Sequence, residues 1–165
     1  MSAAPSARAA IDAEVTIQRP PAEVFAFYRD FQNLPLFLGD VIAVESLGNR
    51  ESRWTIQGPW GIVLHWTVST TDVHENTLIC YETKGPRGLR TGWEVEFSPT
   101  SRPGETRVHE KMSAPFGAVG RAALAWMGKP PLGEVRANLN RLKQVTETGE
   151  VTDTTYAVPG KFRGP

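Results

Sequence analysis

The fold predicted for this chain rests first on LGEVRANLNRLKQVTE, residues 132–147. Four aliphatic residues recur at steps of three and four, at Leu132, Val135, Leu139 and Leu142. This spacing places them in one apolar stripe along an amphipathic helix. Polar residues off that stripe are expected to face water: Asn138, Asn140, Arg141 and Lys143. Gly149 follows as a natural helix end, because glycine readily adopts the left-handed conformation there.

The chain before this helix predicts short strands whose apolar faces need a cover. Strand-like patterns between turn residues mark seven segments: 13–18, 41–47, 52–57, 62–73, 77–83, 92–97 and 106–112. The last six are joined by short loops, which predicts an antiparallel sheet. Between the first and second strands, Pro21 suits the start of a short helix, and residues 31–38 predict a second short helix or turn. The fold class predicted is α+β.

Prolines and composition divide the rest of the chain. Residues 117–127 predict a short helix that ends at Gly128-Lys129-Pro130-Pro131, because proline inside a helix removes a hydrogen bond and clashes with the preceding turn. Residues 1–12 are expected to form a flexible leader, and residues 13–150 one domain. Residues 151–165 lack periodicity and are expected to form a disordered tail.

Composition narrows the classes of function. The chain has 165 residues and a formal net charge of zero. That length suits one domain with a core, and the balanced charge argues against a nucleic-acid partner. No apolar run reaches the roughly 18 residues of a membrane span, and the start lacks the apolar centre of a signal peptide. We therefore expect a cytoplasmic protein without an integral membrane segment.

The histidines and the single cysteine offer no metal or nucleophile pattern. Cys80 alone cannot form an intramolecular disulfide or a multi-cysteine metal site. His65 and His109 alternate with apolar residues and are expected on the outer face, and His74 lies in a turn. Their spacing to carboxylates is not that of a metal site, and no glycine-rich phosphate loop is visible. We expect no metal and no cofactor.

Short sequence words strengthen the fold prediction. They are VTIQRP (15–20), EVFAF (23–27), NLP (33–35), WTIQGP (54–59), Trp66 after Gly61, LNRLK (139–143) and ETGE (147–150). Together they resemble the polyketide cyclase/dehydrase branch of the START-like (SRPBCC) superfamily. The resemblance covers residues 13–151 and implies a helix-grip fold. In that fold a sheet curls around the long C-terminal helix and encloses a cavity for an apolar or aromatic small molecule.

The resemblance leaves two functions open, because one fold hosts many. The first is binding of a lipid, quinone or polyketide-like molecule between sheet and helix. The second is a cyclase or dehydratase acting on a poly-ketone by acid/base catalysis. Segments 115–131 and 85–90 would form the gate. A third reading is a partner module that uses the outer sheet face or residues 151–165. The oligomeric state is not predicted.

Large side chains on predicted inward faces are the candidate ligand-binding residues. They are Tyr28, Trp54, Leu64, Trp66, Tyr81, Trp93, Met112, Phe116 and Trp126. Large rings suit a pocket for a flat ligand, but they fill ordinary cores equally well.

Glu110 and Tyr81 are the candidate catalytic residues. Alternation along residues 106–112 places Glu110 on the apolar face, where a carboxylate has a raised pKa and can act as a general acid/base. The alternative places Glu110 at the open end of its strand, in water or paired with Arg53, Arg90 or Arg107.

Overall fold

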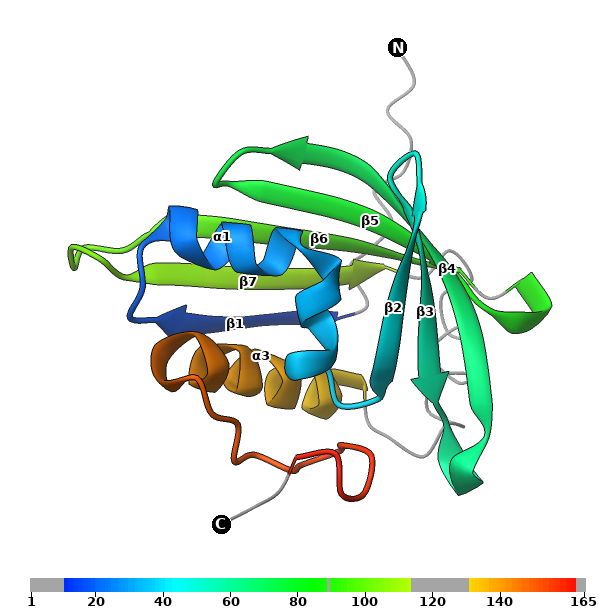
Figure 1. Cartoon of the computed structure of the whole chain (residues 1–165). Helices are drawn as coiled ribbons and strands as arrows, with labels where there is room; N and C mark the ends of the chain where they lie inside the picture. Colours follow the sequence, from blue (N-terminus) through cyan, green and yellow to red (C-terminus); the bar gives the residue numbers. More distant parts are fainter. Residues whose placement is uncertain (1–10, 89, 114–130, 163–165) are drawn as a thin grey trace.

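The computed structural model describes residues 11–88, 90–113 and 131–162. Seven strands form one antiparallel sheet in the order β1-β7-β6-β5-β4-β3-β2. Their bounds are β1 (Ile11–Ile17), β2 (Val41–Gly48), β3 (Glu51–Gln57), β4 (Val63–His74), β5 (Leu78–Lys84), β6 (Arg90–Pro99) and β7 (Thr106–Ser113). The predicted seven-stranded helix-grip fold is confirmed (Figure 1).

Two short helices follow β1, as the sequence predicts. Helix α1 (Pro21–Arg29) has proline in its first turn, where the missing N–H is not needed. The 3₁₀ helix η1 (Phe31–Leu36) is capped by Asp30, whose side chain accepts from the Gln32 backbone N–H at 3.1 Å. Helix α1 contacts β6 and β7, and η1 contacts β2. Two shorter 3₁₀ turns are η2 (Pro59–Gly61) and η3 (Pro86–Gly88).

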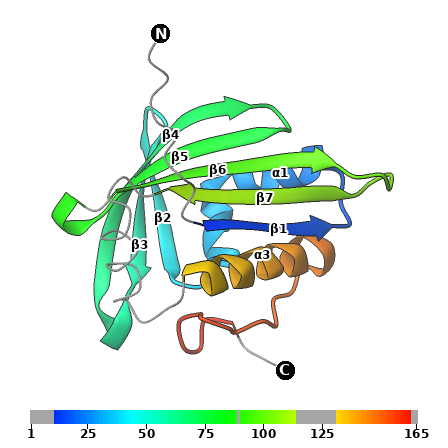
Figure 2. The ribbon, with the colours of Figure 1, turned by 180° about the vertical axis from the view of Figure 1, so that it is seen from behind.

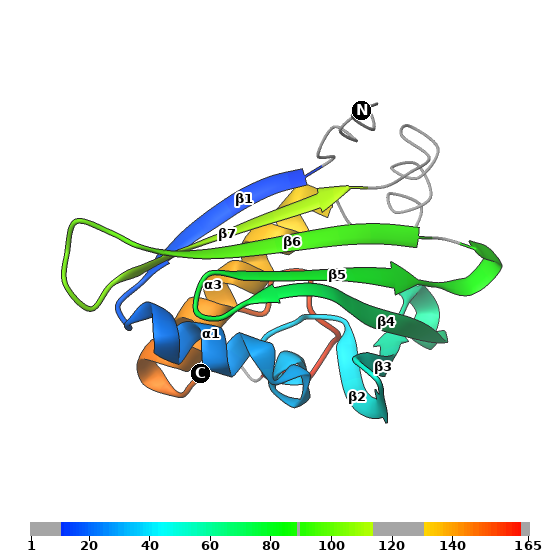
Figure 3. The same cartoon turned by 90° about the horizontal axis from the view of Figure 1, so that it is seen from above.

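The sheet is strongly curved, which creates an inside. β4 is 12 residues long, and its pairing with β5 shifts register between Thr70 and Asp72. Such a bulge bends a strand and increases its twist. Figure 3 shows the sheet from above, with β2 and β3 turned away from the direction of β1, β7 and β6. The concave side faces the helices.

The last helix, α3 (Pro131–Thr148), packs along β1. Its apolar stripe is buried at Val135, Leu139 and Leu142, while Leu132 is 38% exposed. Gly149 ends the helix with φ of +79°, as predicted. The stripe joins one core with residues of α1 and the inner sheet face, among them Val24, Phe25, Ile17, Val68, Ile79, Val95 and Val108.

The predicted solvent face of α3 is wrong for two residues. Asn138 is 8% exposed and Arg141 is fully buried. The cause is residues 151–162, here called the C-terminal segment, which run beside α3 (Figure 2). Arg141 donates to main-chain oxygens of Thr155 at 2.7 Å and Phe37 at 2.7 Å, and to Asn138 Oδ1 at 2.6 Å. The C-terminal segment therefore covers this long polar side chain. The helical periodicity of α3 gives no information about that cover.

The C-terminal segment differs from the predicted disordered tail. The Val158 backbone N–H donates to the Gly39 carbonyl at 2.9 Å, and the Arg141 guanidinium lies 5.2 Å from the centre of the Phe162 ring. Main-chain hydrogen bonds and one buried arginine hold this segment in place. Its low apolar content was therefore a poor guide to whether it is ordered. At the other end, β1 begins at Ile11, inside the predicted leader.

Several predicted features lie outside the described residues: most of the leader, the helix at 117–127, and nearly all of the gate at 115–131. Within the described ranges, no helix is long and apolar enough to cross a lipid bilayer.

Candidate functional site

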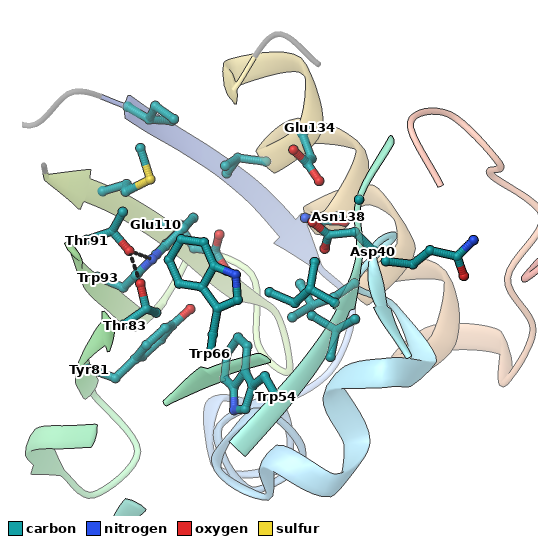
Figure 4. A pocket seen from close by; sticks show the side chains of 18 of the residues that line it. Asp40, Trp54, Trp66, Tyr81, Thr83, Thr91, Trp93, Glu110, Glu134 and Asn138 are labelled. Atoms are coloured by element: carbon teal, nitrogen blue, oxygen red, sulfur yellow. Dashed lines mark hydrogen bonds between the residues drawn. The ribbon is translucent and has the colours of Figure 1, made fainter. Parts of the chain in front are cut away.

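A cavity of about 140 Å³ lies on the concave side of the sheet. Strands β3 to β7 supply most of its wall, α1 supplies Tyr28, and the start of α3 supplies Glu134, Val135 and Asn138. Figure 4 shows the labelled side chains of the sheet on one side of this space and Glu134 and Asn138 of α3 on the other. The curvature of the sheet and the helix across it therefore leave a space between them.

Four aromatic residues on adjacent strands form the main wall. Register pairs Trp54 with Trp66 across β3 and β4, and Tyr81 with Trp93 across β5 and β6. The rings of Tyr81 and Trp93 are nearly parallel, with 8° between their planes and 5.9 Å between centroids. Cross-strand partners point to the same face of a sheet, so their side chains lie side by side. The Tyr81–Trp93 pair, here called the platform, offers a surface on which a flat ring can stack.

Behind the wall, one aromatic side chain from η1 fixes two of these rings. Phe31 contacts Trp54 and Tyr81 edge to face, each with ring centroids 5.5 Å apart. Trp54 and Tyr81 also contact each other at 5.7 Å. Edge-to-face contacts are favoured by the charge distribution of the rings. The wall is therefore packed from behind, while Trp54, Tyr81 and Trp93 each still line the cavity.

A buried carboxylate occupies the cavity wall. Glu110 is 3% exposed and lies in mid-strand, opposite Ala13 on one side and Val95 on the other. The Tyr28 hydroxyl donates to Glu110 Oε1 at 2.8 Å, and the Tyr28 and Tyr81 hydroxyl oxygens are 3.2 Å apart. Three titratable groups from α1, β5 and β7 thus form one hydrogen-bonded chain.

Burial shifts the pKa values of these three hydrogen-bonded groups. Loss of solvation raises the pKa of Glu110 from 4.5 to about 7, and the hydrogen bond from Tyr28 lowers it in part. Burial and the nearby Glu110 charge raise the pKa of Tyr28 and of Tyr81 well above the usual 10. Near neutral pH, Glu110 therefore exchanges a proton while both phenols keep theirs. A carboxyl with a pKa near the working pH is suited to acid/base chemistry.

The remaining polar groups at the cavity are mostly paired. Thr83 and Thr91 hydrogen-bond to each other, and Trp93 Nε1 donates to Thr91 Oγ1 at 2.9 Å. On the opposite side in Figure 4, Asn138 Oδ1 accepts from the Gly39 N–H at 2.9 Å. Among the described residues, Trp66 Nε1 is the buried side-chain nitrogen or oxygen that lacks a hydrogen-bond partner.

A family model described as polyketide cyclase/dehydrase and lipid transport matches residues 8–147. The chain belongs to this family. The START-like resemblance read from the sequence words is thereby confirmed. Comparison with curated proteins found no match.

Solved structures of similar fold include proteins with a stated role and proteins without one. DR_A0006 from Deinococcus radiodurans is 25% identical, with a TM-score of 0.64, over 84% of this chain and 98% of that one. The di-domain ARO/CYC StfQ from the steffimycin biosynthetic pathway is 22% identical, with a TM-score of 0.66, over 84% of this chain and 44% of that one. DynU16, a protein of the dynemicin biosynthetic locus, is 14% identical, with a TM-score of 0.63, over 93% and 50%. The likenesses to StfQ and DynU16 concern the fold alone.

The structure of this family member brings most of the predicted site residues together. The predicted residues that line the cavity are Tyr28, Trp54, Trp66, Tyr81, Trp93, Glu110 and Met112. Leu64 does not line it; it is half-buried and packs against the core. Phe116 and Trp126 lie outside the described residues.

The alternative placement of Glu110 is wrong. Glu110 lies in mid-strand rather than at an open strand end, and its side-chain hydrogen-bond partner among the described residues is Tyr28, not Arg53, Arg90 or Arg107. Arg53 instead forms an ion pair with Glu45. Its Nη1 lies 3.6 Å from Glu45 Oε2, and both side chains are largely exposed. Hydrophobic alternation identified the face of Glu110 correctly but gave no information about its partner.

Sequence reasoning missed several polar residues of the cavity: Asp40, Thr91, Glu134 and Asn138. Asn138 carried a usable signal, because it lies three positions after Val135 and so shares a helix face with it. Thr91 carried a weaker one, since it alternates with Trp93. Asp40 carried none, because it lies in a loop.

Proposed function

We propose that this protein binds a small, neutral, aromatic molecule in the cavity between the sheet and α3. The observation that carries the proposal is the aromatic wall of Trp54, Trp66, Tyr81 and Trp93 around a space of about 140 Å³. Apolar pockets with a few placed polar groups are the usual form of a small-molecule site. The family description, which includes both cyclases and lipid transport, supports a hydrophobic ligand of this kind.

The size of the cavity favours one or two rings. An engineered apolar cavity of about 150 Å³ holds benzene. The space here is similar, and the platform adds a flat surface. A ligand with one ring or two fused rings is therefore expected to bind better than a long acyl chain.

The charges along the wall favour a neutral ligand. The described lining residues include the acidic Asp40, Glu110 and Glu134, but no lysine, arginine or histidine. A buried anionic group without a cationic partner is costly. Fatty acids and aromatic carboxylates are therefore expected to bind more weakly than uncharged aromatics of the same size.

The test is a titration monitored by tryptophan fluorescence and by thermal shift, with naphthalene derivatives, 2-naphthoate and palmitate as probes. Binding of the neutral aromatics and much weaker binding of both anions is the expected result. Trp93→Leu should weaken binding about tenfold or more, because the platform is lost. Trp60→Leu is the matched control, since Trp60 is 83% exposed and does not line the cavity. Equal loss in both variants, or tighter binding of palmitate, would contradict the proposal.

A second candidate function is catalysis of the cyclase or dehydratase kind. The specific observation that favours it is the chain of Glu110, Tyr28 and Tyr81 at the cavity wall, with a carboxyl pKa of about 7. The family description, which names polyketide cyclases and dehydrases, also supports such chemistry.

In this reaction the ionised Glu110 removes a proton from the carbon beside a ketone. The electron pair of that C–H bond moves into the C–C bond, and the carbonyl oxygen becomes an enolate oxygen. The Tyr81 hydroxyl donates a hydrogen bond to that oxygen, and Tyr28 positions the carboxylate. The proton on Glu110 is then available for return to carbon or for a leaving hydroxyl.

Exchange of the α-hydrogens of 2-tetralone in D₂O, followed by NMR, tests this step. The wild type should accelerate the exchange, with a rate that rises with pH through about 7. Glu110→Gln should bind the ketone equally well but lose the acceleration. If the variant exchanges the hydrogens as fast as the wild type, Glu110 is not the base.

A further inference from the structure

Three tryptophans of the aromatic wall differ in how their indole N–H is satisfied. Trp54 Nε1 donates to Ser52 Oγ at 2.9 Å, and Trp93 Nε1 donates to Thr91 Oγ1 at 2.9 Å. In both strands the acceptor lies two positions before the tryptophan, on the same face. This local solution supplies a hydroxyl to each of these two indoles.

Trp66 lacks this solution. The residue two positions before it is Leu64, which has no acceptor, and Trp66 Nε1 has no partner among the described residues. Trp66 is only 7% exposed, so bulk water does not replace the missing partner. A buried donor without a partner destabilises the empty protein, and native proteins rarely retain one without a reason.

The position of Trp66 leaves the cavity as the place for a partner. One side of the ring packs on the backbone at Gly85, where an added Cβ would lie 2.7 Å from three ring atoms. The residue also lines the cavity, and Figure 4 shows its ring among the lining side chains. Gly85 therefore holds one side of the ring. The N–H is buried in the empty structure, so an acceptor in the cavity reaches it when neighbouring side chains shift.

We propose that the indole N–H of Trp66 donates a hydrogen bond to a neutral carbonyl oxygen of a flat aromatic ligand stacked on the platform. The ligand class is thus an aryl ketone or quinone rather than an aromatic hydrocarbon or carboxylate. This inference rests on the proposed binding function, and it assigns Trp66 as the residue that recognises the carbonyl group of the ligand. Trp54 and Trp93 are excluded from this role, because their N–H groups are already occupied.

A matched pair of ligands separates this inference from the binding function. 2-Acetylnaphthalene and 2-ethylnaphthalene differ in one oxygen and have nearly the same shape. The wild type should bind the ketone about tenfold more tightly, which is the usual effect of one well-placed neutral hydrogen bond. Equal affinity for both compounds would overturn the role of Trp66 but leave aromatic binding intact. Failure of both to bind would overturn the binding function itself.

Two variants test the residue. Trp66→Phe removes the donor and should reduce the preference for the ketone to about twofold or less. Leu64→Thr keeps the donor but supplies the hydroxyl that the other two strands have, and it should give the same reduced preference. Because Leu64→Thr retains the ring, it stays informative if Trp66→Phe fails to fold. A preference that is unchanged in a folded variant of either kind would overturn the proposal.

The indole N–H can also be observed directly. The chain has five tryptophans, so a ¹H–¹⁵N spectrum contains five indole signals, and Trp66→Phe identifies the one from Trp66. Addition of 2-acetylnaphthalene should shift that signal downfield, whereas 2-ethylnaphthalene should not. An equal response to both compounds would count against hydrogen bonding to the carbonyl.

Discussion

Replacement of Glu110 by glutamine should change how the stability of this protein depends on pH. Glutamine has the shape of the protonated acid, and its carbonyl oxygen can still accept the hydrogen bond that Tyr28 donates at 2.8 Å. The substitution therefore removes one titrating group from the core with little change in packing. The difference between the two proteins isolates the cost of ionising Glu110.

The magnitude follows from the pKa. Burial raises the pKa of Glu110 from 4.5 to about 7 in the folded protein. Between these values the folded state holds a proton that the unfolded state has released, so stability falls as pH rises through this window. Ionisation of Glu110 therefore lowers the unfolding free energy of the wild type, relative to Glu110→Gln, by about 3 kcal/mol in full. Nearly all of this loss is reached by pH 8. At pH 5 less than about 1 kcal/mol is expected.

Urea unfolding, followed by tryptophan fluorescence at pH 5, 6, 7 and 8, measures this difference. Glu110→Gln should have nearly the stability of the wild type at pH 5 and exceed it by about 3 kcal/mol at pH 8. Parallel curves for the two proteins would refute the argument, because they would mean that Glu110 titrates alike in both states.

Glu96→Gln is a control in which the stability should depend on pH in the opposite direction. Partial burial raises the pKa of Glu96, but hydrogen bonds from its neighbours, including Lys111, outweigh this and lower it. A lowered pKa contributes stability above the unfolded value that is lost as the pH falls. Glu96→Gln should therefore weaken the protein near neutral pH and leave it unchanged in acid. Its side chain is 42% exposed, so the effect should be small and sensitive to salt.

Three further predictions concern the same core. Tyr28→Phe removes the hydrogen bond that lowers the pKa of Glu110, so that pKa should move further above 7, measured by NMR titration of the carboxyl carbon; an unchanged midpoint would mean that the hydroxyl has no influence. Arg141→Met leaves several buried carbonyls without donors and should cost roughly 2–4 kcal/mol of unfolding free energy. The C-terminal segment should then be cut faster in limited proteolysis, and an unchanged rate would mean that Arg141 does not hold this segment in place. Gly39→Ala places a Cβ 2.7 Å from Arg141 Nη2 and 3.0 Å from a main-chain oxygen of the same segment, and it should cost about 1–3 kcal/mol in urea unfolding. Gly58→Ala, with its nearest neighbour at 3.4 Å, should cost clearly less, and equal losses would contradict the steric argument.

Periodicity predicted the fold well, because burial on one side of an element imposes it. The strands β1 to β7 and helix α3 were each predicted within two residues of their ends. Alternation also placed Trp54, Tyr81, Trp93 and Glu110 on the inner face. These predictions need only the geometry of one strand or helix, which local sequence carries.

Contacts between distant segments could not be predicted in this way. Tyr28 and Glu110 are 82 positions apart, and their hydrogen bond depends on how α1 crosses the sheet. The missing partner of Trp66 is similar in kind: Leu64 shows that no local hydroxyl is present, but only the packing shows that the N–H is buried.

Local sequence patterns were enough to predict which faces of the strands and of α3 are apolar, and with them the class of fold and the aromatic character of the cavity. Folding then established which groups the buried polar side chains contact, and it buried Asn138 and Arg141, which the helical pattern had placed in water. Arg141 shows the physical reason: its burial comes from main-chain oxygens of Phe37 and Thr155, and every residue type carries such atoms. Main-chain partners leave no pattern in the sequence and become visible only when the chain has folded.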